Sequence, residues 1–394
     1  MIAVIADDFT GAAEIGGIGL RYGLNVVIET EDIQSHNADL LIIATDTRSL
    51  SAKEASEHIF QITKELQKLK PQFIFKKIDS ALRGNIAEEL LAEMEALGKN
   101  RAIIIAANPV FKRIIQNGIY YIDGTPLHET CFSSDPEHPI NSSSVLEIVG
   151  AGNTTILHNL KPDDELPEKG LIIGDATSYE DLEKWVSRID KQTLIAGASG
   201  FFDALLVKQS SFQTSQNPPP FVPYGQNSLY VLGSTYPKNY DFVKKLEESG
   251  YFLSNMPVEI YNNRNFDPSH LESWVDHIVK GISKHQKVAI SVVHPPSNES
   301  DITSRIKIIM GELIKKVTEQ ISIHELIIEG GSTTYMVLEH LNIKKLFPIH
   351  ELDTGVIRMK IDGWANLCLT TKPGSYYWPD SFWQPSEILQ TNQT

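Results

Sequence analysis

The sequence predicts an α/β protein made of two α/β domains. In the first hundred residues, apolar strand-like runs alternate with amphipathic helical stretches, and the same alternation starts again after residue 227. Continuous apolar strands that alternate with helices are typical of a parallel sheet covered on both faces. We therefore expect the N-terminal domain to be an open, mostly parallel sheet with helices on both faces.

The N-terminal part contains five predicted strands and three predicted helices in strict order. The strands are the apolar runs "MIAVIA" (1–6), "NVVIE" (25–29), "ADLLIIATDTRS" (38–49), "QFIFKKIDS" (72–80) and "RAIIIAANP" (101–109). The helices follow the first, third and fourth strands, at "TGAAEIGGIGLRYG" (10–23), "KEASEHIFQITKELQKLK" (53–70) and "NIAEELLAEMEALG" (85–98).

The middle of the chain is less regular. We interpret "YYIDGTPLHET" (120–130) as a turn followed by a loop. Two units of strand, polar turn and helix follow, at "LIIGDATSYEDLEKW" (171–185) and "TLIAGASGFFDALL" (193–206). We assign both to the N-terminal domain.

A stretch rich in Pro, Ser and Gln separates the two domains. It covers residues 208–227, has little hydrophobic periodicity and is predicted to be a linker. The predicted domains are therefore 1–207 and 228–394.

The second domain repeats the alternation of strands and helices. Strands are expected at "SLYVLGS" (228–234), "KVAISVVHP" (287–295), "ELIIE" (325–329) and "GWANLCLTTK" (363–372). Helices are expected at "YDFVKKLEESG" (240–250) and "IKIIMGELIKKVTEQ" (306–320).

Composition excludes several classes of function. The 394 residues carry a formal net charge of -15, with no basic stripe, which argues against a nucleic-acid partner. Cys131 and Cys368 lack metal-type spacing, so we expect free thiols in a reducing compartment. The start of the chain has no basic leader, and no apolar run approaches a membrane span. We expect a cytoplasmic protein that is not bound to a membrane.

Polar side chains follow the predicted strands of the N-terminal domain at the point where each strand ends. Open parallel sheets bind their ligands outside the carboxyl ends of the strands. These ends read "ADD", "TDTR", "KKIDS" and "ANPVF". We therefore expect one binding rim that contains Asp7, Asp8, Asp46, Arg48, Lys76, Lys77, Asp79 and Asn108.

The rim has the residue types that a phosphoryl transfer to a hydroxyl needs. A carboxylate beside the hydroxyl can accept its proton, and oxygen ligands suit Mg²⁺. Asp7 and Asp8 fit these roles, and we expect only one to meet the substrate, because neighbours on an extended strand face opposite sides. A substrate anion could bind the basic groups Lys76, Lys77, Arg83 and Arg113. The block "KKIDSALRGN" adds Asp79, Ser80, Arg83, Gly84 and Asn85 in one strand-to-helix turn.

Three glycine turns in the second domain suggest a phosphate site. The sharpest, "IIEGGSTT", contains Gly330, Gly331, Ser332 and Thr333, where free amides at a helix start favour an anion. The others are "VLGST", with Ser234, and "TTKPGS", with Lys372 and Gly374. None is a Walker A loop, because no Gly-Lys-Ser/Thr follows. We expect an α/β nucleotide-binding domain that holds a polyphosphate.

These motifs together resemble the four-carbon acid sugar kinases, formerly a domain family of unknown function. The motifs "ADDFTGA", "KKIDSALRGN", "NPVF", "DGTPLHET", "IGDATSYEDL", "GASGF", "VLGS", "EGGST" and "TTKPGS" occur in the family's order over nearly the whole chain. The resemblance implies that the N-terminal domain binds a small sugar acid and the C-terminal domain binds ATP. Members phosphorylate threonate, erythronate, 3-oxo-tetronate or related acids, typically at the terminal hydroxyl.

The resemblance also implies roles for particular residues. Asp8 with Asp7 would be catalytic, with Asp8 accepting the hydroxyl proton. The acid-sugar site would contain Asp79, Ser80, Arg83, Gly84 and Asn85, to which the charge pattern adds Lys77 and Arg113. The nucleotide site would contain Ser234, Gly330, Gly331, Ser332, Thr333 and Gly374. We expect ATP and Mg²⁺ to take part, in a cleft between the domains. The metal ligands and the oligomeric state stay open, and a homodimer is compatible with the sequence.

Two other classes of function remain open at this point. "VIADDFT" is similar to the strand of aspartate-dependent sugar phosphatases, although its acids are adjacent instead of alternate. A two-domain sensor that binds a sugar acid without catalysis would predict no effect of a nucleotide. A dehydrogenase is disfavoured, because "GGIGLRYG" lacks the dinucleotide-binding spacing.

Overall fold

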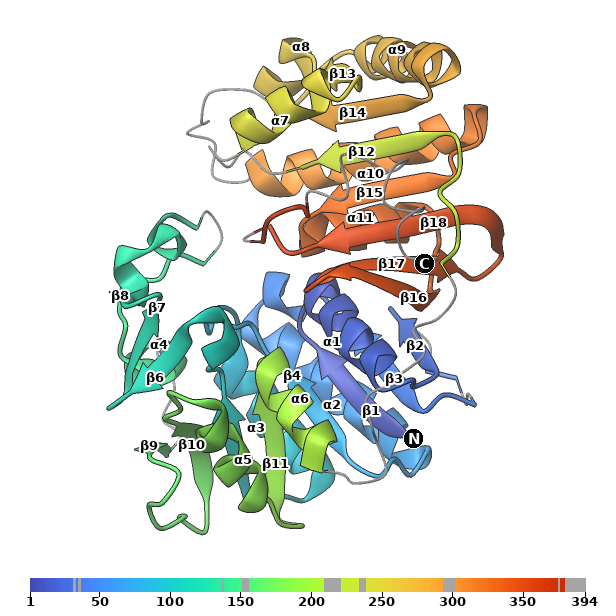
Figure 1. Ribbon diagram of the computed structural model, residues 1–394. Coiled ribbons are helices and arrows are strands. Elements are labelled where there is room, and N and C mark those ends of the chain that lie inside the picture. Colours follow the sequence, from blue (N-terminus) through green and yellow to red (C-terminus); the bar gives the residue numbers. More distant parts are fainter. Residues whose placement is uncertain are drawn as a thin grey trace, which may run out of the picture. The chain divides into compact units, whose positions relative to one another are not determined.

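The structure is a computed structural model that describes residues 1–30, 33–34, 37–135, 138–150, 156–208, 221–233, 239–292, 302–374 and 376–379. It divides into two compact units, Met1–Pro218 (unit 1) and Pro219–Thr394 (unit 2). Each unit contains a twisted sheet with helices packed against it (Figure 1). The predicted α/β fold class is confirmed.

Unit 1 contains a parallel sheet in the order β2-β3-β1-β4-β11-β5-β10-β9. The central position of the first strand in this order is typical of doubly wound sheets. The strands are β1 (Ile2–Ala6), β2 (Val26–Glu29), β3 (Leu40–Ala44), β4 (Ile74–Lys77), β5 (Arg101–Ile105), β9 (Leu157–Leu160), β10 (Gly170–Gly174) and β11 (Thr193–Gly197).

Helices cover both faces of this sheet (Figure 1). Helices α1 (Phe9–Arg21), α5 (Tyr179–Ser187) and α6 (Ser199–Lys208) pack together on one face, and α2 (Ala52–Lys68) and α3 (Ile86–Leu97) on the other. A short helix, α4 (Val145–Gly150), packs beside β9. Every residue of β1 and β3 is consequently buried, which explains their unbroken apolar sequences.

Local sequence signals set the ends of the helices. Helix α2 begins with a capping box, in which Ser51 and Glu54 satisfy each other's backbone amides. It buries Ala55, Ile59, Thr63 and Leu66, which recur at helical spacing along one face. Helix α3 ends at Gly98, whose φ of 65° belongs to the left-handed region that glycine adopts without a steric penalty.

The prediction of a turn and a loop for residues 120–130 is wrong in part. A small antiparallel sheet forms there from β6 (Arg113–Gln116), β7 (Ile119–Ile122) and β8 (Thr125–Pro126). Its two tight turns are Asn117–Gly118 and Asp123–Gly124, in which all four residues have positive φ. Asn-Gly and Asp-Gly are strong hairpin signals, and reading the second as a turn without flanking strands missed the sheet.

Unit 2 contains a mixed sheet in the order β13-β14-β12-β15-β18-β17-β16. The first five strands of that order are parallel, and β18, β17 and β16 form an antiparallel meander. The strands are β12 (Ser228–Leu232), β13 (Phe252–Asn255), β14 (Lys287–Ser291), β15 (Glu325–Glu329), β16 (Lys345–Asp353), β17 (Val356–Ile361) and β18 (Trp364–Lys372).

The helices of unit 2 are α7 (Asn239–Glu248), α8 (Val258–Asn262), α9 (Pro268–His285), α10 (Ile302–Gln320) and α11 (Gly331–His340). The sequence predicted α7, α10 and the strands β12, β14, β15 and β18, and the helix start expected at the turn "IIEGGSTT" belongs to α11. It did not anticipate β13, α8, α9 or the strands β16 and β17, which it left without an assignment.

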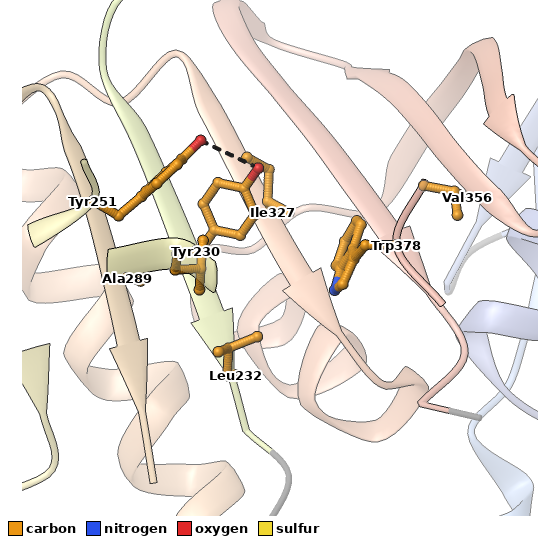
Figure 2. Close-up of a cluster of buried hydrophobic side chains, with 8 residues drawn as sticks. Tyr230, Leu232, Tyr251, Ala289, Ile327, Val356 and Trp378 are labelled. Carbon is orange, nitrogen blue, oxygen red and sulfur yellow. Dashed lines mark hydrogen bonds between the residues drawn. The ribbon is translucent and has the colours of Figure 1, made fainter. Parts of the chain in front are cut away.

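An aromatic cluster forms part of the core of unit 2 (Figure 2). The rings of Tyr230 and Tyr251 meet edge to face with their centroids 4.8 Å apart, and the Tyr251 hydroxyl donates to that of Tyr230 at 3.4 Å. Trp378 joins the cluster from beyond β18, and its indole N–H donates to Glu329 Oε2 at 3.1 Å. Residues 376–379 are thus anchored on the sheet of this unit.

The boundary between the units lies at Pro218 and Pro219, between the end of α6 and the start of β12. Part of the 208–227 segment packs on unit 2, since Gly225 N donates to Glu325 Oε1 at 3.1 Å and Arg358 donates to the carbonyl of Val222. The binding roles expected for the two domains stay predictions.

Candidate functional site

Three loops of unit 1 leave the sheet side by side. Ala6, the last residue of β1, pairs in register with Ala44 of β3 on one side and with Lys77 of β4 on the other. Because these strands are parallel, the polar residues that follow each of them lie at one edge of the sheet. We call Asp7, Asp8, Arg48 and Asp79, together with Lys77 at the end of β4, the carboxyl-edge cluster of unit 1.

Arg48 lies at the centre of the cluster. Its guanidinium donates to Asp7 Oδ2 from Nε at 3.1 Å and from Nη2 at 2.9 Å. Asp8 and Asp79 each lie 3.4 Å from its terminal nitrogens. Burial lowers the pKa of Arg48, but the three carboxylates outweigh it and raise the pKa well above its usual value. Arg48 was predicted at the rim, but its part in joining three acids was not.

Asp79 organises the turn between β4 and α3. Its Oδ2 accepts hydrogen bonds from the backbone amides of Ala81 at 3.1 Å and Arg83 at 3.2 Å. The Arg83 guanidinium binds both carboxylate oxygens, each at 2.8 Å. Burial raises the pKa of Asp79, but Arg48 and Arg83 outweigh it and hold the pKa well below its usual range. Asp79 is therefore ionised at neutral pH.

Asp8 and Asp7 have different environments. Asp8 is the N-cap of α1, where Oδ1 accepts from Gly11 N at 2.8 Å and Oδ2 accepts from the Thr10 hydroxyl at 2.7 Å. Burial raises the pKa of Asp8, but Arg48 and Lys77 contribute to a net lowering. Asp7 accepts from Arg48 and from the Asp79 amide through Oδ2, and its buried Oδ1 has no hydrogen-bond partner among the described residues.

The two lysines of β4 face opposite sides of the sheet. Lys77 lies in the cluster, with Nζ 3.0 Å from the Ile78 carbonyl and 3.7 Å from Glu14 Oε2. Lys76 points to α3, is fully buried and lies 2.5 Å from Glu89. The expectation that Lys76 contributes to the rim is therefore wrong, because side chains alternate along a strand.

Glycine 11 allows Asp8 and Lys77 to approach α1. A Cβ at Gly11 would lie 2.7 Å from Asp8 Oδ1 and 3.1 Å from Lys77 Nζ. On the far side of Lys77, Glu14 accepts from Ser199 at 2.9 Å, and Asn108 donates to Ser199 at 3.3 Å. The predicted rim residue Asn108 is thus connected to the cluster through two side chains.

The remaining predicted residues of the acid-sugar site lie beside Asp79. Arg113 donates to the Ser80 hydroxyl. Gly84 has a φ of 93°, and a Cβ there would lie 2.9 Å from Arg48 Cγ. Asn85 donates to the carbonyls of Thr47 at 3.1 Å and Leu50 at 2.9 Å. Gly84 and Asn85 therefore hold the loop of residues 47–50 against the turn after β4. Ser80 and Arg113 instead supply polar side chains beside Asp79.

A later segment, which sequence analysis did not connect to the site, contacts the cluster. We call Phe132, Asp135 and His138 the cover segment. Asp135 Oδ2 accepts from Arg83 Nη1 at 2.7 Å, and His138 Nε2 lies 2.9 Å from the Arg48 carbonyl. The Phe132 ring lies 5.0 Å from the Arg83 guanidinium. No sequence motif marked these residues.

In unit 2, the predicted glycine loop forms the start of a helix. Gly330 follows β15 with a φ of 97° and is the N-cap of α11. Gly331, Ser332 and Thr333 form the first turn of that helix, where backbone amides lack partners within the helix. Such amides can bind a phosphate.

Two further loops reach the same edge of unit 2. A Cβ at Gly233 would lie 2.6 Å from Thr333 Oγ1, so the end of β12 meets the start of α11. Gly374 follows β18, whose Lys372 pairs in register with Glu329 of β15. Ser234 lies outside the described residues. The structure thus places Gly330–Thr333 and Gly374 at neighbouring strand ends.

Lys372, at the same edge, is neutralised within the protein. It is buried, with Nζ 2.9 Å from Glu329 Oε2 and 5.2 Å from the centre of the Trp378 ring. Its charge therefore balances Glu329. A cavity of about 670 Å³ lies at the opposite end of β15, where Glu325 begins that strand and pairs in register with Cys368 of β18, so it is not part of the predicted nucleotide site.

The N-terminal half of the chain matches a known protein family. The family model named sugar-binding N-terminal domain matches residues 2–205, more than half of the chain. The chain belongs to this family. Asp7, Arg48 and Asp79 of the carboxyl-edge cluster, and Arg113 beside it, all lie within the matched residues.

Relatives within the family confirm the resemblance to four-carbon acid sugar kinases. The D-threonate kinase of Salmonella typhimurium is 32% identical over 224 residues, which are 52% of this chain and 53% of that protein. The D-erythronate kinase of Heliobacterium modesticaldum is 24% identical over 331 residues, which are 77% of this chain and 73% of that protein. The chain thus aligns with about half the length of the first relative.

A solved structure has the same fold. The crystal structure of Haemophilus influenzae protein HI1011, of family DUF1537, superposes with a TM-score of 0.70 at 20% identity and covers 98% of this chain and 99% of that one. Among the described residues, every helix is too short or too polar to cross a membrane. Cys131 is exposed and Cys368 is buried, and neither forms a disulfide among the described residues.

The described residues contain no group of three His, Cys, Asp or Glu side chains placed to hold a metal ion. The acids of the carboxyl-edge cluster, Asp7, Asp8 and Asp79, instead surround the Arg48 guanidinium. The predicted Mg²⁺ therefore has no protein ligands assigned to it.

Proposed function

We propose that the chain is an ATP-dependent kinase that phosphorylates the terminal hydroxyl of a four-carbon sugar acid of the threonate, erythronate or 3-oxo-tetronate type. Membership of the sugar-binding family and the names of its relatives support this class of reaction. The observation that carries the proposal is the carboxyl-edge cluster, in which acids and bases for an anionic polyol lie at the ends of adjacent parallel strands.

Unit 1 binds the sugar acid in this proposal. The cations for the substrate carboxylate are Arg83, which binds Asp79, and Arg113, which binds Ser80, and a guanidinium suits a carboxylate because it offers parallel N–H donors. Lys77 adds a further cation at the other side of the cluster. Ionised Asp79 accepts hydrogen bonds and can bind a substrate hydroxyl.

Asp8 accepts the proton of the attacking hydroxyl, and Asp7 holds Arg48. Asp8 is the more exposed of the two, at 7% against 3%. Its lowered pKa keeps the carboxylate ionised at neutral pH. A weak base suffices here, because in phosphoryl transfer the protein mainly positions the reactants and stabilises charge.

Unit 2 binds ATP through backbone groups. The amides of Gly331, Ser332 and Thr333 at the start of α11 favour phosphate, and Gly374 and Ser234 complete the proposed site. Mg²⁺ enters with the nucleotide in this proposal, since it is commonly held by substrate phosphates and a few protein groups. Cytoplasmic location and a homodimer stay predictions.

A coupled assay of ADP release tests the proposal. Stereoisomers of threonate, erythronate and 3-oxo-tetronate are each supplied with Mg-ATP. We expect turnover with at least one acid, loss of turnover in Asp8→Asn, and unchanged nucleotide binding in that variant. Asp123→Asn, at an exposed turn, is the matched control and should retain full activity.

Three results would contradict the proposal in different ways. Full activity of Asp8→Asn removes Asp8 from the mechanism. Acid binding without ADP release from any of the acids favours the sensor. Release of phosphate from sugar phosphates without ATP favours the aspartate-dependent phosphatase.

A further inference from the structure

Arg83 has two kinds of carboxylate partner. Nε and Nη2 bind Asp79, four residues earlier in the chain, at 2.8 Å each. Nη1 binds Asp135, which lies 52 residues later, at 2.7 Å. The first contact belongs to the turn that also binds the Arg83 amide. The second contact joins Arg83 to the cover segment.

The two contacts differ in what they hold. Asp79 fixes the orientation of the guanidinium, because it binds two of its nitrogens and two backbone amides of the same turn. Asp135 binds the remaining terminal nitrogen, at the partly exposed side of the cluster. The Arg83 side chain is 20% exposed and that of Asp135 is 13% exposed. A dissolved anion can therefore reach this ion pair and replace Asp135.

The surroundings of Nη1 are suited to an anion. The Phe132 ring has the Arg83 guanidinium 5.0 Å and the Arg113 guanidinium 6.0 Å from its centre. The two guanidiniums beside this ring carry two positive charges and Asp79 balances one of them, so a second carboxylate is attracted to this position. Asp135 supplies such a carboxylate from within the chain.

We propose that Asp135 is an internal competitor for the substrate carboxylate, which occupies Nη1 of Arg83 until a sugar acid displaces it. Asp135 then sets the affinity of the site and selects anionic over neutral polyols, since only an anion restores the second charged partner that Arg83 has in addition to Asp79. This inference rests on the proposed assignment of Arg83 to the acid-sugar site.

Displacement of Asp135 also affects the rest of the cover segment. The His138 amide donates to Asp135 Oδ1 at 2.7 Å, and the His138 ring lies 2.9 Å from the Arg48 carbonyl. Movement of Asp135 is therefore coupled to the loop that carries Arg48. Binding of a carboxylate at Arg83 therefore also changes the contacts of the loop that carries Arg48, at the centre of the carboxyl-edge cluster.

The test compares wild type with Asp135→Asn and Asp135→Ala in the full chain. Calorimetric titration without ATP measures the Kd of D-threonate and D-erythronate, and the ADP assay measures KM for acid and for ATP. We expect both variants to bind the acids about tenfold more tightly, as loss of one competing charged hydrogen bond implies, with KM for ATP unchanged. Binding of the neutral polyols threitol and erythritol should gain much less.

Asp123→Asn is the matched control, because Asp123 pairs with Lys112 at an exposed turn and should leave all these constants unchanged. Unchanged or weaker acid binding in both Asp135 variants, with wild-type thermal unfolding, overturns the inference. So does the absence of acid binding in every variant.

The proposed kinase activity can fail separately. Tighter acid binding in the variants without any ADP release supports the role of Asp135 and contradicts the kinase. ADP release from wild type with no decrease of Kd or KM for the acid in the variants supports the kinase and contradicts the role of Asp135.

Discussion

The carboxyl edges of the two sheets differ in the chemical groups that they offer to an anion. In unit 1, the carboxyl ends of the strands carry buried charged side chains, with Arg48 in contact with Asp7, Asp8 and Asp79. In unit 2, the corresponding ends carry glycines and hydroxyls, and Lys372 is already neutralised by Glu329. One edge offers paired charges, and the other offers backbone amides.

The difference predicts two kinds of vulnerability. Buried charges must be matched, because removal of one partner leaves the other desolvated and unpaired. Backbone amides carry no net charge and instead depend on conformations that only glycine adopts easily. Loss of a charge should therefore harm unit 1 most, and addition of a Cβ should harm the glycine loop of unit 2.

The largest expected effect is that of Arg48→Met. This change leaves Asp7, Asp8 and Asp79 near one another without their shared cation, and we expect a loss of about 3–5 kcal/mol in the free energy of unfolding. Urea denaturation measures it. Lys53→Met is the control, because Lys53 is exposed and forms only a surface pair with Glu57, and it should change stability by about 0.5 kcal/mol or less. Equal effects of the two substitutions would contradict the importance of charge matching.

The second prediction concerns Glu93, a fully buried acid of α3. Burial raises its pKa to about 7, even though Lys76 opposes the shift; Glu89 also raises it and Lys99 lowers it. The folded chain keeps this proton up to about pH 7, whereas the unfolded chain loses it near pH 4.5, so Glu93 reduces stability progressively between these values. The reduction is roughly 3 kcal/mol at pH 8.

Glu93→Gln removes this titration. We expect the variant to be more stable than wild type at pH 8 and not at pH 4.5, as thermal unfolding over a pH series would measure. Glu95→Gln, on the exposed side of the same helix, should leave the pH profile of wild type unchanged. A wild-type profile in Glu93→Gln as well would show that Glu93 is not the group that titrates.

The third prediction concerns the backbone conformation of Gly330 in the glycine loop of unit 2. Gly330 has a φ of 97° and a ψ of 137°, a region that is essentially limited to glycine, although a Cβ there would meet no atom within 4 Å. Gly330→Ala should therefore lose about 1–3 kcal/mol through backbone strain alone and raise KM for ATP. Thermal unfolding and the ADP assay measure the two effects.

Gly374→Ala is the matched control for that loop. Gly374 also has open space around its Cβ position, but its φ is not positive, so stability should stay within about 0.5 kcal/mol of wild type. If the two alanine variants lose the same stability, strain at Gly330 is not the cause.

The smallest expected change in stability is that of Gly11→Ala. Alanine favours the helix by up to about 1 kcal/mol, which offsets the crowding of its Cβ against Asp8 and Lys77. We expect little change in unfolding but a higher KM for the sugar acid, because Asp8 and Lys77 must move. An unchanged KM would show that the cluster tolerates this displacement.

Sequence analysis predicted the parallel sheet of unit 1 and the location of its polar edge. It failed where the signal was short or absent: the strands of the hairpins in 113–126 have four residues in β6 and β7 and two in β8, and β16 and β17 lie outside the regular alternation. It also could not assign a side to each lysine of β4, since Lys76 and Lys77 have the same chemistry and differ only in the helix that each one faces.

The sequence alone determined the alternation of strands and helices in the regular part of unit 1 and the polar residues that follow those strands, because periodicity and turn chemistry act over a few neighbouring residues. Only the tertiary structure decided the partners. Arg48 binds Asp7 across 41 residues, Arg83 binds Asp135 across 52, and the Asp79 amide binds Asp7 across 72. Such pairings depend on how the loops pack at one sheet edge, which no local pattern specifies.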